Sequence, residues 1–138
     1  MPETQHWEIL VENETPRWDA AGALGLCRAV NQVILGEKNC ATAMQDLYHF
    51  QLFLDWFGRD FKRYTKIEAQ PEIRLKSAFR VATSEAFGTN PSTETACKFL
   101  VSELSRLSNN GKPHQKFITF VKEMIEMLEG SVEQKVHA

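Results

Sequence analysis

Residues 44–64, MQDLYHFQLFLDWFGRDFKRY, decide the fold of this chain. Their apolar side chains recur at alternating steps of three and four residues, which is the spacing of one face of an α-helix. The residues on this face are Met44, Leu47, Phe50, Leu54, Phe57, Phe61 and Tyr64. Further apolar residues widen the surface beyond a narrow stripe: Tyr48, Leu52, Phe53 and Trp56. Because such a helix must pack against neighbours on several sides, the sequence predicts that it is the centre of a small helical domain.

The spacing of apolar residues predicts four further helices around this one. They cover roughly residues 19–35, 70–87, 91–107 and 113–129. No segment shows sustained alternation of period two, so we expect no sheet. The predicted fold class is all-α, a compact helical bundle of about five main helices joined by short turns. Residues 1–18 are expected to form an extended acidic lead-in that docks on the domain, and residues 19–138 a single all-α domain.

Individual residues predict where these helices begin and end. Asn90, which precedes a proline, is a strong helix start, because its side chain accepts a hydrogen bond from the first turn and proline needs no partner there. Thr42, with Gln45 three residues later, has the pattern of a capping box for the central helix. Gly88 and Gly130 each follow an apolar helical segment, so they predict helix ends.

Length and charge bound the class of protein. The chain has 138 residues and a formal net charge of −2, so there is no global electrostatic case for nucleic acid or a membrane surface. No apolar run approaches the roughly 20 residues that span a bilayer. The N-terminal residues are acidic and lack the basic start and apolar core of a signal peptide. We therefore expect a cytoplasmic protein.

Residue types that carry covalent or metal chemistry are scattered. An odd number of cysteines without a CxxC pair, Cys27, Cys40 and Cys97, argues against a disulfide framework or a zinc site and for small apolar packing residues. Of the histidines, His49 is predicted to pack among aromatic residues and His114 to be exposed and inert. Phosphate-binding, zinc-protease and hydrolase motifs are absent from the sequence. The sequence thus predicts no cofactor, no metal site and no enzyme chemistry.

Positive charge is concentrated in one segment. Residues 59–80 contain seven basic and three acidic residues. Such a run is usually a solvated face. The more specific interpretation is a surface that binds anionic lipid headgroups or an acidic protein. Binding to lipid would make the protein peripheral to a membrane. Nucleic acid is not expected, because exposed aromatic residues do not alternate with the charges. The residues of this candidate membrane surface are Arg59, Lys62, Arg63, Lys66, Arg74 and Lys76.

Taken in order, these elements resemble a divergent, fungal-like regulator of G-protein signalling (RGS) homology domain. Typical members have a phenylalanine-leucine pair, a polar turn, and a Glu-Asn-Leu sequence that opens a long aromatic helix. Residues 34–35, Glu37 and residues 45–47 are similar to that arrangement, and residues 53–64 continue like the fungal form of the helix.

The C-terminal part extends the likeness, which covers roughly residues 20–136. In the family a phenylalanine opens a helix that ends on a Leu/Met-Glu pair, followed by a short Asp-Ser turn and a basic residue. Asn90 resembles the asparagine that the family presents from its middle loop. The residues similar to the C-terminal pattern are Phe117, Met124, Met127, Leu128, Glu129, Ser131 and Lys135.

The resemblance implies a protein-interaction domain that binds the switch regions of a GTP-loaded Gα subunit. Domains of this family donate no covalent group, so the chain would be at most a GTPase-activating regulator. They brace the switch loops of Gα, which preorganises the transition state of GTP hydrolysis. The partner-binding residues implied here are Asp46, Asn90, Met127, Ser131 and Lys135.

Departures from the family pattern bear on whether hydrolysis is accelerated. The turn before the long helix is a few residues longer than usual. Asp46 stands where the family has asparagine, and an ionised aspartate accepts hydrogen bonds but donates none. Ser131 and Lys135 stand where the family typically has aspartate and arginine, and lysine lacks the planar two-pronged contact of arginine. A domain that binds Gα without accelerating hydrolysis is therefore a serious alternative.

The same residues also have purely structural interpretations. Asp46 suits the positive end of a helix dipole, Asn90 is an ordinary N-cap, and Ser131 fits a polar tail. The alternative function is an unrelated all-α interaction or dimerisation domain with no GTPase partner, in which Trp7 and Trp18 contribute to the interface.

Overall fold

The computed structural model describes residues 20–59, 75–88 and 92–137, with the backbone alone at residues 20, 56–59, 76 and 131–137. No strand occurs in these ranges, and the predicted all-α class is confirmed. The acidic lead-in and its docking lie outside the described residues. The helices are α2 (Ala20–Ile34), α3 (Met44–Arg59), α4 (Leu75–Phe87), α5 (Thr93–Ser108) and α6 (Gln115–His137).

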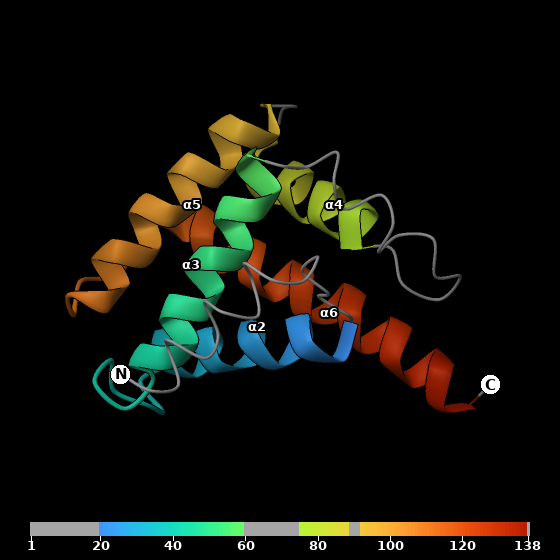
Figure 1. The fold of residues 1–138 in the computed structure, drawn as a ribbon, viewed down its shortest axis with the longest axis horizontal. Coiled ribbons are helices and arrows are strands. Elements are labelled where there is room, and N and C mark those ends of the chain that lie inside the picture. Colours follow the sequence, from blue (N-terminus) through green and yellow to red (C-terminus); the bar gives the residue numbers. More distant parts are fainter. Residues whose placement is uncertain (1–19, 60–74, 89–91, 138) are drawn as a thin grey trace, which may run out of the picture.

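Two helices organise the packing of the others (Figure 1). The central helix α3 packs against α2 and α5, while the longest helix, α6, packs against α2 and α4. Figure 1 shows α2 and α6 running in opposite directions along the longest axis. An ion pair between Arg28 and Glu129, 2.7 Å from nitrogen to oxygen, joins these two helices.

Aromatic side chains from three helices form the core. Phe50 of α3 meets Phe117 of α6 edge to face with ring centroids 6.5 Å apart, and Phe79 of α4 meets Phe120 of α6 at 5.3 Å. All four rings are fully or almost fully buried. Each buried aromatic side chain contributes about 2–3 kcal/mol through removal from water. The predicted central role of the aromatic helix is therefore confirmed where its inner face is described, at Leu47, Phe50, Phe53 and Leu54.

The start of α3 differs from the prediction. Met44, the first residue of the predicted apolar stripe, is 64% exposed, because it begins the helix at an end of the bundle. Thr42 lies in the preceding turn and is not the N-cap. Its backbone N–H donates to Asn39 Oδ1 at 2.8 Å, so Asn39 stabilises the turn that leads into α3.

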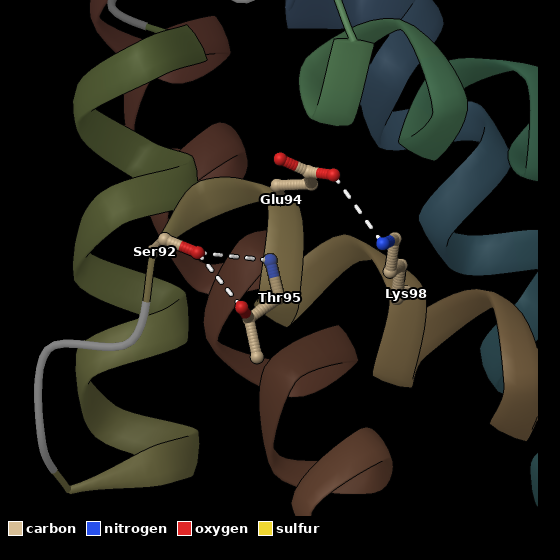
Figure 2. A network of polar contacts seen from close by, with 4 residues as sticks. All are labelled: Ser92, Glu94, Thr95 and Lys98. Atoms are coloured by element: carbon tan, nitrogen blue, oxygen red, sulfur yellow. Dashed lines mark hydrogen bonds and ion pairs between the residues drawn. The ribbon is translucent and has the colours of Figure 1, made fainter.

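The start of α5 also differs from the prediction. The N-cap is Ser92, whose hydroxyl accepts a hydrogen bond from the Thr95 N–H at 3.1 Å and contacts the Thr95 hydroxyl at 2.8 Å (Figure 2). Beside this cap, Glu94 forms an ion pair with Lys98 at 3.3 Å. The prediction that Asn90 caps this helix is therefore wrong. Asn90 itself lies outside the described residues.

The two glycines predicted to end helices behave differently. Gly88 follows α4 with φ +71°, a left-handed conformation that favours glycine, and confirms the predicted end. Gly130 lies inside α6, which continues to His137, so the predicted end there is wrong. A single glycine costs only about 1 kcal/mol relative to alanine, and a long helix already formed tolerates that loss.

Alanine substitution at these two glycines tests the difference. A Cβ atom at either position meets nothing within 4 Å, so only the backbone matters. We expect Gly130→Ala to raise the free energy of unfolding by about 0.5–1 kcal/mol through helix propensity. Gly88→Ala should lower it by about 1–2 kcal/mol, because alanine is strained at positive φ. Urea unfolding measures both, and destabilisation by Gly130→Ala would contradict the continuation of α6.

Removal of the Ser92 hydroxyl tests the start of α5. We expect Ser92→Ala to lower the free energy of unfolding by about 1 kcal/mol, since the Thr95 N–H loses its partner. Ser92→Thr is the matched control, because threonine retains a hydroxyl acceptor, and it should cost clearly less. Equal losses for both variants in chemical denaturation would exclude the capping role.

Candidate functional site

The described part of the chain offers little for metal or membrane chemistry. In residues 20–59, 75–88 and 92–137, no three His, Cys, Asp or Glu side chains lie where they could hold a metal ion. In the same ranges, no helix is both long enough and apolar enough to cross a membrane.

Two cysteines are packing residues, as predicted. Burial raises the pKa of the Cys27 thiol to about 12. Burial, followed by the nearby carboxylate of Asp55, raises the pKa of the Cys97 thiol to about 12 as well. Both thiols stay protonated at neutral pH and are poor nucleophiles.

Exposed apolar side chains and a carboxylate lie in and next to the turn between α2 and α3. Leu35 is the first residue of this turn and is 57% exposed, and Met44 follows the turn. Asp46 lies in the first turn of α3 and is half-buried. We name Leu35, Met44 and Asp46 the turn surface. The Cys40 thiol within this turn donates to the Leu107 carbonyl oxygen at 2.8 Å, which anchors the turn to the end of α5.

Two other predicted partner-binding residues, Ser131 and Lys135, lie away from the turn surface, and Asn90 lies outside the described residues. Met127 is 37% exposed on α6, and Ser131 and Lys135 lie on the continuing α6 helix rather than in a turn after it. This corrects the expected turn, because α6 does not end at Gly130. Figure 1 shows the first turn of α3 and the C-terminal end of α6 toward opposite ends of the longest axis.

Four of the six residues of the candidate membrane surface lie in residues 60–74, outside the described residues. Arg59 ends α3 and Lys76 is the second residue of α4, both with the backbone alone described. Arg80, the last basic residue of the run, is exposed on α4. Binding of this segment to anionic lipid therefore stays a prediction.

A second surface combines aromatic rings with positive charge. Phe87 at the end of α4 meets Phe99 of α5 edge to face, with centroids 5.3 Å apart, and Phe99 meets the His114 ring at 5.9 Å. Lys116 Nζ lies 5.8 Å from the Phe87 centroid, which is a cation–π distance. Both phenylalanines are half-buried, whereas His114 and Lys116 are exposed. We name these four residues the aromatic–basic patch.

A buried carboxylate that sequence reasoning missed supports this patch. Glu103 is only 5% exposed on α5, and its Oε1 accepts a hydrogen bond from the His114 N–H at 2.5 Å. Its Oε2 lies 3.9 Å from Arg106 Nη2. His114 is exposed as predicted but not inert, because its Nδ1 accepts from the Lys116 N–H at 3.1 Å. The sequence signal that could have revealed Glu103 is a glutamate at a position where the apolar spacing of α5 places a buried residue.

Negative charge gathers elsewhere on α4 and α6. Partial burial, then the carboxylates of Glu126 and Glu85, raises the pKa of Glu123 above its ordinary value. Glu123 is only partly buried, so the loss of solvation is modest and screening by water is substantial. The like charges around it nevertheless oppose its ionisation.

No protein-family model matches the chain, and no curated protein or solved structure matches it either.

Neutralisation of Glu123 should stabilise the domain in a pH-dependent way. The pKa of Glu123 is higher in the folded than in the unfolded chain. Its ionised carboxylate therefore lowers the free energy of unfolding, and this loss grows as pH rises from the ordinary carboxyl pKa through the raised one. We therefore expect Glu123→Gln to melt above the wild type at pH 7, and the difference to vanish near pH 3.

The matched control is Glu94→Gln on α5. Glu94 is exposed and pairs with Lys98, so its loss should destabilise by at most about 0.5 kcal/mol. Thermal melting followed by circular dichroism at both pH values measures each variant. A lower melting temperature for Glu123→Gln at pH 7 would contradict the repulsion among these carboxylates.

Proposed function

We propose that this chain is an RGS-like protein-interaction domain that binds a GTP-loaded Gα subunit through the turn surface. The observation that carries the proposal is the exposure of Leu35 and Met44, the most exposed large apolar side chains of the described residues. They flank the segment that the resemblance relates to Gα contact. Exposed apolar residues beside a polar group are typical of binding hot spots.

The proposed activity is binding, without strong acceleration of GTP hydrolysis. Acceleration by the family requires several loops to brace the switch regions together. Asp46 accepts hydrogen bonds but cannot donate them when ionised. Ser131 and Lys135 lie on α6, away from the turn surface. The resemblance and the geometry together favour a contact made mainly by the α2–α3 turn.

Binding to a panel of Gα classes tests the proposal. Each Gα subunit is loaded with GDP and aluminium fluoride or with GDP alone, and the affinity of the full chain is measured by calorimetry. We expect at least one class to bind preferentially in the aluminium fluoride state. Leu35→Ser and Met44→Ser should each weaken this binding about tenfold, which corresponds to about 1.4 kcal/mol.

The matched control variant is Val81→Ser on α4. Val81 is 39% exposed but lies outside the turn surface, so its loss should leave the affinity unchanged. Circular dichroism verifies that all variants are folded. State-independent or absent binding across the panel would exclude the Gα proposal. A dimer that Met44→Ser dissociates in sedimentation would instead support the interaction domain without a GTPase partner.

A further inference from the structure

Two residues of the aromatic–basic patch, His114 and Lys116, lie in a stretch of sequence that carries only positive charge. Residues 104–122 contain four basic residues and no acidic ones. The first turn of α6 holds no acidic side chain, although the positive end of the helix dipole lies there. The basic residues are Arg106, Lys112, Lys116 and Lys122.

The acidic side chains of α4 and α5 nearest the patch in sequence interact with groups other than Lys116. Glu103 is buried and accepts from the His114 N–H. Glu94 pairs with Lys98. Glu85 precedes Phe87 by two residues and so lies on the opposite side of α4, where it adds to the repulsion at Glu123. The positive charge of Lys116 is thus not balanced by a described carboxylate.

The N-terminal segment of the same chain has the complementary chemistry. Residues 1–19, which lie outside the described residues, contain five acidic residues and one basic residue. Residues 7–10 read Trp-Glu-Ile-Leu and combine a large aromatic ring, a carboxylate and two aliphatic side chains. An aromatic surface rimmed by positive charge fits such a segment.

The length of the segment allows this contact. The Arg28–Glu129 ion pair fixes the register of the antiparallel helices α2 and α6. At 1.5 Å per helical residue, Ala20 lies about 30 Å from Lys116 along the bundle. The chain from Glu8 to Ala20 spans up to about 40 Å when extended, whereas the chain from Glu14 to Ala20 spans only about 20 Å. An extended chain therefore lets Glu8 reach the patch.

We propose that residues 7–10 dock on the aromatic–basic patch of their own chain, with Trp7 against the rings of Phe87 and Phe99 and Glu8 paired with Lys116. Attachment to the same chain gives the segment a high effective concentration, so modest contacts suffice. The docked segment leaves the turn surface untouched, and the contact does not depend on a Gα partner.

A zero-length carbodiimide, which joins a lysine amine to a touching carboxylate, tests the contact in the full wild-type chain. We expect mass spectrometry to find Glu8 or Glu3 joined to Lys116 or Lys112. An equal mixture of ¹⁴N and ¹⁵N chains distinguishes the source of the carboxylate. Cross-links that pair a light with a heavy chain would overturn the proposal in favour of a second copy. Cross-links of Glu8 only to lysines other than Lys116 and Lys112, or none at all, would also overturn it.

A charge swap gives an independent measurement. In a chain whose only tryptophan is Trp7 (Trp18→Phe, Trp56→Phe), Lys116→Glu should raise acrylamide quenching of Trp7 about twofold, as the ring becomes exposed. Adding Glu8→Lys should restore the original quenching.

The control for the swap is Lys38→Glu, the same charge change in the α2–α3 turn, which should have no effect. Unchanged quenching in Lys116→Glu, or no rescue by the swap, would overturn the pairing. If circular dichroism shows that the chain with Trp7 as its only tryptophan is unfolded, the cross-linking result decides the question.

Discussion

The edge-to-face contact between Phe50 and Phe117 joins the two halves of this domain. Helix α5 packs on α3, and α4 packs on α6, while α2 packs on both α3 and α6. The Phe50–Phe117 contact and helix α2 therefore both connect the α3–α5 pair to the α4–α6 pair. Because both rings are fully buried, a smaller side chain at either position would leave a cavity that several helices share, and such cavities cost about 3–5 kcal/mol.

This arrangement also decides where a binding surface can lie. The described inner face of α3, at Phe50, Phe53 and Leu54, is buried in the core. Among the described residues, the exposed large apolar side chains next to a turn are Leu35 and Met44. The binding proposed at the turn surface therefore does not use the inner face of the aromatic helix, although that helix dominates the sequence.

Much of the fold could be predicted, because burial of large rings is a strong and periodic signal. Phe50, Phe79, Phe117 and Phe120 occupy the positions that helical spacing gives them. Helix ends were predicted less well, because caps and single glycines change helix stability by only about 1 kcal/mol. Asn90 and Ser92 are both good caps, and local sequence does not decide between candidates of similar strength. Gly130 has the sequence signature of a helix end, but its local cost does not stop a helix of this length.

The candidate sites were harder to predict, because they depend on what lies next to a side chain rather than on its spacing. Met44 belongs to the apolar stripe by sequence, yet no described helix covers the end of the bundle where it lies. Glu103 interrupts an apolar face, and its partner is a backbone N–H in the loop after the same helix. Periodicity identifies the face of a helix. It does not identify which turn of that face remains uncovered or which backbone group a carboxylate will meet.

The two surfaces differ in the physics that governs them, and this separates their roles. Lys116 lies near the positive end of the α6 dipole, where a lysine is unfavourable, and the Glu103 carboxylate offsets only part of that charge. The docking proposed at the aromatic–basic patch would therefore gain from a carboxylate and weaken as salt rises. The binding proposed at the turn surface would rely on Leu35 and Met44, whose contribution on burial depends little on moderate salt. Salt concentration would thus separate occupation of one surface from occupation of the other within a single intact chain.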